Sequence, residues 1–94
     1  MVSDLTILAA AADKPHPRRM PTAEQLRAAR AMLGITIEEL ASRSGVSART
    51  IARCEAGEGI PLVSVRTLRK LVQAYEREGL EFTQNGQGVR LRRR

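Results

Sequence analysis

The segment from Ile37 to Ala56, IEELASRSGVSARTIARCEA, most constrains how this chain can fold. Its pattern predicts two short helices that cross at a steep angle over a tight turn. Ala41 is small enough to let the two helices approach closely, and Gly45 permits the positive φ that the turn requires. Val46 and Ile51 are expected to point inward and to fix the second helix on the first.

The second helix of this pair is expected to run from Ser47 to Glu55, with Ser47 as its N-cap. Leu40 and Cys54 are expected to pack on its inner side. Its outer side then carries short and cationic side chains, namely Ala48, Arg49, Thr50, Ala52 and Arg53. A small and cationic face of this kind is suited to a groove.

The net charge of the chain is +6, and the positive excess is unevenly distributed. Residues 1–46 carry six Lys or Arg against five Asp or Glu, whereas residues 47–94 carry ten against five. The excess therefore begins at the expected outward-facing helix, which favours a polyanionic partner. Tyr75 and Phe82 are the only aromatic residues, and this scarcity argues against a stacking surface for single-stranded nucleic acid.

Capping residues predict where the flanking helices begin and end. Thr22 is expected to cap a helix that runs to Leu33 and ends at Gly34. Thr36 is expected to cap the next helix in a capping box with Glu39. A further helix is predicted over about residues 63–78, where Leu68, Leu71, Val72 and Tyr75 share one face. This apolar stripe has two interpretations, which are packing on the core and a dimerisation seam.

The last part of the chain has the pattern of a β-hairpin. Asn85-Gly86 is a preferred type I′ turn. Folding the chain about it gives three cross-strand pairs with consistent chemistry: Leu80 with Leu91, Glu81 with Arg90, and Phe82 with Val89. An isolated hairpin is only marginally stable. Its apolar face is therefore expected to pack on the 63–78 helix or on the same hairpin of a second chain.

These patterns divide the chain into an arm (1–20), a helical domain (21–79), and a hairpin with a basic tail (80–94). The arm forms either a short helix over residues 3–12 or no regular structure, and Pro15 and Pro17 stop any helix there. The cations of the arm and of the tail suit phosphate contacts or a solvated surface; they are Lys14, Arg18, Arg19, Arg92, Arg93 and Arg94.

The remaining composition excludes several kinds of site. The single Cys54 cannot form an internal disulfide and is expected to be a small core residue. The single His16 has no ligand cluster around it, so no metal site is expected. The chain shows no nucleophile–base pair and no phosphate-binding loop, which argues against an enzyme and against a cofactor. Membrane-spanning and secretory segments are also not expected, and the cytoplasm is the expected location.

From about Thr22 to Gly57 the chain resembles the Cro/C1-type, or XRE-type, helix-turn-helix repressors. The residues that carry the resemblance are QLRAARAMLG from Gln25, TIEELA from Thr36, SGVSARTI from Ser44, and CEAG from Cys54. The resemblance implies a mainly α, compact domain of four to five helices, here followed by the C-terminal β-hairpin.

The resemblance also implies how such a domain contacts DNA. The helix over residues 47–55 would enter the major groove, with Ala48, Arg49 and Arg53 toward the base edges. Arg49 is the first candidate for direct readout, because a guanidinium can donate two hydrogen bonds to guanine. Ser47 and Thr50 would reach phosphate or the near edge of a base.

Four other positions match the family pattern or depart from it. Thr36 would hold a phosphate at the N-terminus of its helix. The next position is often glutamine in the family, whereas this chain has Ile37, so the site preference of better-known members does not transfer. Arg30 and Glu55 occupy positions that are ion-paired in several members, and such a pair would set the tilt of the reading helix.

The function predicted from these observations is sequence-specific binding of double-stranded DNA by a transcriptional regulator. The regulator is expected to be a repressor and a homodimer. Two alternatives stay open. One is an antitoxin that binds its operator and neutralises a partner toxin through the first twenty residues or the hairpin. The other is a protein-interaction adaptor that uses the same fold without DNA specificity.

Overall fold

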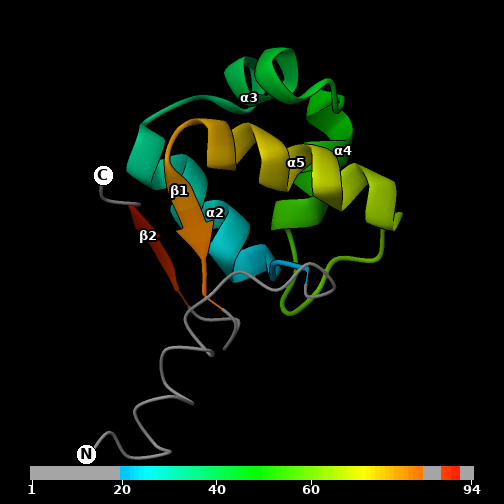
Figure 1. Cartoon of the computed structure of the whole chain (residues 1–94). Helices are drawn as coiled ribbons and strands as arrows, with labels where there is room; N and C mark the ends of the chain where they lie inside the picture. Colours follow the sequence, from blue (N-terminus) through cyan, green and yellow to red (C-terminus); the bar gives the residue numbers. More distant parts are fainter. Residues whose placement is uncertain (1–19, 84–87, 92–94) are drawn as a thin grey trace, which may run out of the picture.

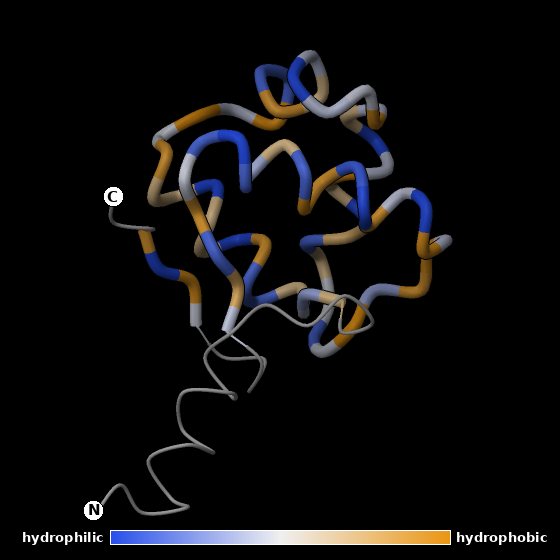
Figure 2. Tube along the Cα trace, viewed as in Figure 1, coloured by the Kyte–Doolittle hydropathy of each residue, from blue (hydrophilic) through white to orange (hydrophobic). Residues whose placement is uncertain are grey.

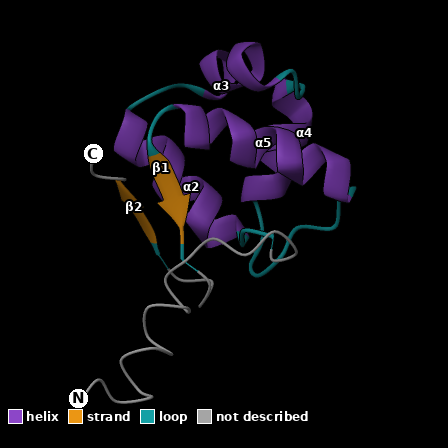
Figure 3. Ribbon diagram, viewed as in Figure 1, coloured by secondary structure: helices purple, strands orange, loops and turns teal. Residues whose placement is uncertain are grey.

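The computed structural model describes residues 20–83 and 88–91. Four helices are followed by a two-stranded antiparallel sheet: α2 (Ala23–Leu33), α3 (Ile37–Ser44), α4 (Ala48–Glu55), α5 (Val65–Arg77), β1 (Leu80–Phe82) and β2 (Val89–Leu91) (Figures 1 and 3). This mainly helical fold with a C-terminal hairpin confirms the predicted fold class. The expected helix over residues 3–12, the Asn85-Gly86 turn and the arginines at 92–94 lie outside the described residues.

The first three helices begin where their capping residues predict. Thr22 accepts a hydrogen bond from the Gln25 N–H, and Thr36 accepts one from the Glu39 N–H; both form complete capping boxes. The prediction for α5 was two residues too early, because Ser64 is the N-cap and accepts from the Thr67 N–H. A serine oxygen satisfies an unpaired helix N–H directly, and it therefore outweighs the apolar pattern that begins at residue 63.

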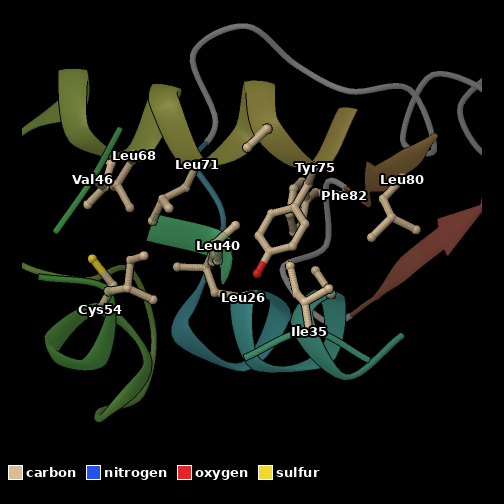
Figure 4. Packing of buried hydrophobic residues seen from close by; sticks show 13 residues of the cluster. Leu26, Ile35, Leu40, Val46, Cys54, Leu68, Leu71, Tyr75, Leu80 and Phe82 are labelled. Carbon is tan, nitrogen blue, oxygen red and sulfur yellow. The ribbon is translucent and has the colours of Figure 1, made fainter. Parts of the chain in front are cut away.

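One apolar core joins all four helices and β1 (Figures 2 and 4). Its buried members are Leu26, Ala29, Ile35, Leu40, Val46, Ile51, Cys54, Leu68, Leu71, Ala74, Tyr75, Leu80 and Phe82. The stripe on α5 therefore faces this core and not a dimerisation seam. Tyr75 is fully buried, and its ring meets the Phe82 ring edge-on with centroids 5.7 Å apart. Aromatic pairs favour this arrangement because a positive ring edge meets a negative ring face.

The hairpin packs within its own chain. Its register pairs Leu80 with Leu91, Glu81 with Arg90, and Phe82 with Val89, as the sequence predicts. β1 lies against α5, and β2 lies beside α2. Leu80 is fully buried, so the apolar face of β1 completes the core of the same molecule.

Gln25 ties the first helix to the hairpin. Its side chain is buried, with a relative exposure of 1%. The amide nitrogen Nε2 donates to the carbonyls of Thr83, at 2.9 Å, and Gly88, at 2.8 Å. The amide oxygen Oε1 accepts from the Thr22 N–H at 2.9 Å. One side chain thus caps α2 and fixes both strands at the turn end of the hairpin.

Replacing Gln25 with leucine is expected to lower the free energy of unfolding by about 1–3 kcal/mol. The substitution preserves bulk but leaves the N–H of the half-buried Thr22 without the Gln25 oxygen and removes the amide donors to the hairpin. Gln73→Leu is the matched control, because Gln73 is exposed on α5; its effect is expected to stay within about 0.5 kcal/mol. Urea unfolding measures the stability of both variants. Equal losses of stability would contradict the proposed role of Gln25 in linking α2 to the hairpin.

Candidate nucleic-acid interface

The turn between α3 and α4 sets the angle at which α4 leaves the core. Gly45 ends α3 with φ 78° and ψ 10°, and its N–H donates to the Ala41 carbonyl at 3.0 Å. The Ser44 hydroxyl accepts from the Val46 N–H at 3.1 Å. Val46 is buried and Ala41 packs against the same core while half-buried. These contacts fix α3 and α4 as one helix-turn-helix unit.

Gly45→Ala is expected to lower the free energy of unfolding by about 1–2 kcal/mol, because a Cβ strains backbone at this positive φ. Gly57→Ala is a close control. Neither Gly45 nor Gly57 has a heavy atom within 4 Å of the position that a Cβ would take, and only Gly45 has a positive φ. The Gly57 variant is therefore expected to be neutral or slightly stabilised. Similar melting temperatures for the two variants would exclude backbone strain at Gly45.

Helix α4 has an inner and an outer side. Ile51, Cys54 and Glu55 are buried on the inner side. Burial raises the pKa of the Cys54 thiol, so Cys54 behaves as a small core side chain. The outer side presents the sequence-predicted set: Ser47, Arg49, Ala52 and Arg53 are exposed, and Ala48 and Thr50 are half-buried. The structure therefore brings these expected contact residues together on one surface.

The hydroxyls at the start of α4 are organised by each other. The Ser47 oxygen accepts from the Thr50 N–H at 3.2 Å and its hydroxyl donates to the Thr50 hydroxyl oxygen at 2.9 Å. Ser47 is thus an N-cap that also orients Thr50 toward solvent. Both residues retain hydrogen-bonding capacity for an incoming phosphate or base.

The start of α3 differs from a vacant anion site. Thr36 is exposed, but its N–H already donates to the Glu39 carboxylate at 2.9 Å, and this hydrogen bond lowers the pKa of Glu39. The adjacent Ile37 is half-buried and packs against the core. An isoleucine here covers apolar surface, whereas the glutamine of the family pattern would offer an amide.

The C-terminal end of α4 is held by an ion pair. Arg30 Nε lies 2.9 Å from Glu55 Oε2, and Arg30 Nη2 lies 2.9 Å from Glu55 Oε1, so the contact is bidentate. The Arg30 and Glu55 side chains are 28% and 8% exposed, and hydrogen bonding to Glu55 raises the pKa of Arg30. Arg30 Nη1 also donates to the Ile35 carbonyl at 3.1 Å. Helix α2, the α2–α3 turn and α4 therefore meet at one guanidinium.

Arg27 makes a second set of contacts that fix the end of α4, and the sequence analysis did not predict them. Its Nη1 donates to the carbonyl of Glu55 at 2.6 Å and to that of Gly57 at 2.9 Å. Carbonyls at a helix end need such donors, because no later residue of the helix supplies them. The available sequence signal was the three-residue spacing of Arg27 and Arg30, which puts both on one side of α2.

The described cations divide into two groups according to their partners. Five are engaged with carboxylates or carbonyls: Arg27, Arg30, Arg43, Arg77 and Arg90. Within residues 20–83 and 88–91, the other five form no ion pair or hydrogen bond: Arg49, Arg53, Arg66, Arg69 and Lys70. Two of the five unengaged cations, Arg49 and Arg53, lie on the exposed side of α4.

Comparisons with known proteins assign the family. A family model described as a helix-turn-helix domain matches residues 23–83, from the first residue of α2 to just past β1. No curated protein matches the chain. Among the described residues, none of the helices combines the length and the apolar character that crossing a bilayer would take. Because the matched segment is more than half of the chain and contains α3, Gly45 and α4, the chain belongs to the helix-turn-helix domain family.

Proposed function

We propose that this protein is a sequence-specific DNA-binding transcriptional regulator of the Cro/C1 type, acting as a repressor with α4 in the major groove. The observation that carries this proposal is the pair Arg49 and Arg53, exposed on α4 and unengaged by the described part of the chain. Guanidinium groups without internal partners supply both charge for the DNA backbone and donors for base edges.

The rigid hold on α4 supports a reading role. Base discrimination requires side chains placed within a fraction of an ångström, and a site on a fixed helix meets this requirement better than a loop does. Ile51 anchors α4 in the core, and the side chains of Arg27 and Arg30 hold its last turn. The outer side of α4 is therefore presented in one orientation.

The individual roles follow from position and chemistry. Arg49, in the first turn of α4, is proposed to donate two hydrogen bonds to guanine, and Arg53 to contact a neighbouring base or phosphate. Ala48 offers a methyl contact to thymine. Ser47 and Thr50 are assigned to the DNA backbone near the N-terminus of α4. Thr36 is assigned to the backbone through its hydroxyl, because its N–H already donates to Glu39. Ile37, packed on the core, is assigned to an apolar contact at the edge of the groove.

A homodimer is part of the proposal. One recognition helix covers only a few base pairs, whereas two symmetric copies separated by about one helical turn multiply the selectivity. Since Leu80 and Phe82 of β1 are buried in the core of their own chain, the dimer contact is assigned to residues outside this buried face.

The experiment that tests this function is in vitro selection from random duplex DNA with the full chain at about 0.15 M salt. The expected result is a two-fold symmetric motif whose half-sites contain guanine. Binding that enriches no motif and disappears with added salt would show recognition of the phosphate backbone alone, and would reject a sequence-reading repressor.

A further inference from the structure

The other three unengaged cations lie together on α5. Arg66, Arg69 and Lys70 are exposed, and with Val65 and Gln73 they line a shallow groove that is open to solvent and is formed by α5 alone. The five positions fall at helical spacing, so their side chains emerge from one side of the helix. The remaining side of α5 is the apolar stripe buried in the core.

The placement of Arg66 opposes the stability of α5. The helix dipole favours acids in the first turn, and α2 and α3 comply with Glu24, Glu38 and Glu39. In α4 and α5 the first turn contains no acid, and α5 places Arg66 there. Helix α5 therefore lacks the favourable first-turn acid, as does α4, the proposed DNA-reading helix. This shared feature indicates that α5 also uses its charge for binding.

Exposed apolar side chains lie at the start of α5 and just before it in the chain. Leu62 is 99% exposed, Ile60 is 56% exposed and Val65 is 53% exposed. Ile60 and Leu62 belong to the short segment that leads into α5, and Val65 is the first residue of α5. Exposed apolar side chains this close together indicate a contact surface. The charged phosphates of DNA would not cover an apolar side chain such as Leu62.

The groove lies on a different surface from the outer side of α4. Helix α4 packs on α2 and α3, whereas α5 packs on α3 and β1 (Figure 1). Each helix turns its apolar side toward the common core, so their exposed sides face different directions.

We propose that the α5 groove binds an acidic amphipathic segment of a partner protein. Carboxylates of the segment pair with Arg66, Arg69 and Lys70, and its apolar side chains cover Leu62 and Val65. This interaction is additional to DNA binding and uses a separate surface. It supplies a site through which a second protein can reach the regulator while α4 remains on its operator.

The test combines a peptide selection with a matched pair of charge reversals. Full-length chain is used to select from a library of displayed random short peptides at about 0.15 M NaCl. Enriched peptides are then measured on Arg69→Glu/Lys70→Glu and on Arg49→Glu/Arg53→Glu. Both variants carry the same charge change on exposed helical positions. Arg69→Gln/Lys70→Gln repeats the test without charge reversal, and melting curves verify that all variants fold.

The expected result is enrichment of peptides that combine Asp or Glu with large apolar residues. Reversal on α5 should weaken them at least about tenfold, and reversal on α4 by less than about threefold. Leu62→Ser should weaken these peptides but not an all-glutamate peptide. Enrichment of peptides without acids, or equal weakening by both reversals, would overturn the proposal. Loss of duplex DNA affinity through the α5 reversal, to the extent seen for α4, would also overturn it and assign the groove to phosphate.

Discussion

Glu55→Ala is expected to lower the free energy of unfolding by about 2–4 kcal/mol. Removing one partner of a buried ion pair costs about 3–5 kcal/mol, because the remaining charge has lost its compensation. The cost here is set somewhat lower because the Arg30 side chain is 28% exposed and can recruit water. In a domain of this size the melting temperature should fall by roughly 10–25 °C.

A double-mutant cycle separates the ion pair from the packing of each side chain. Arg30→Ala should also be strongly destabilising, since it leaves the 8%-exposed Glu55 carboxylate unpaired. The double variant should lose at least about 1 kcal/mol less than the sum of the two single losses. Additive losses in urea unfolding would show that the two charges do not stabilise each other.

The sequence predicted those parts of the fold whose signals are local. Capping by Thr22, Thr36 and Ser47 follows from the residue type and its position before a helix. The hairpin register follows from alternation and a turn dipeptide. Each of these signals depends on residues a few positions apart, so the chain displays them directly.

The contacts that the sequence did not predict are hydrogen bonds from a side chain to a backbone carbonyl. Arg27 binds the carbonyls of Glu55 and Gly57, and Gln25 binds those of Thr83 and Gly88. Every residue has a carbonyl, so the sequence contains no pattern that marks the acceptor. Only the three-dimensional path of the chain shows which carbonyls come within reach.

The sequence also could not predict which charged side chains have partners. The sequence shows where Lys and Arg accumulate, but not which of them are already engaged. Arg43, for example, is paired with Glu78, which follows it by more than thirty positions, at 3.6 Å. Separating engaged from unengaged cations reduced the basic surface of the described chain to α4 and α5, and this distinction came from geometry alone.

The second large effect is expected in DNA recognition. Arg49→Ala should weaken binding to the selected operator by about 1–3 kcal/mol, or roughly 5- to 150-fold. The reason is the loss of a bidentate contact to guanine from the first turn of α4. The loss should be concentrated at one base pair of each half-site, where the variant should accept other bases nearly equally.

Arg49→Lys distinguishes base reading from simple charge. Lysine keeps the positive charge but lacks the planar pair of donors, so this variant should retain the salt dependence of binding while losing discrimination at that base pair. Arg69→Ala removes the same charge from α5 as Arg49→Ala removes from α4, and it is expected to change operator affinity by less than about threefold. Fluorescence anisotropy on matched and single-substituted duplexes measures all three variants.

If Arg49→Ala weakened every duplex equally and flattened the salt slope by about 0.9, Arg49 would be a phosphate contact. The specificity of α4 would then have to reside in Arg53.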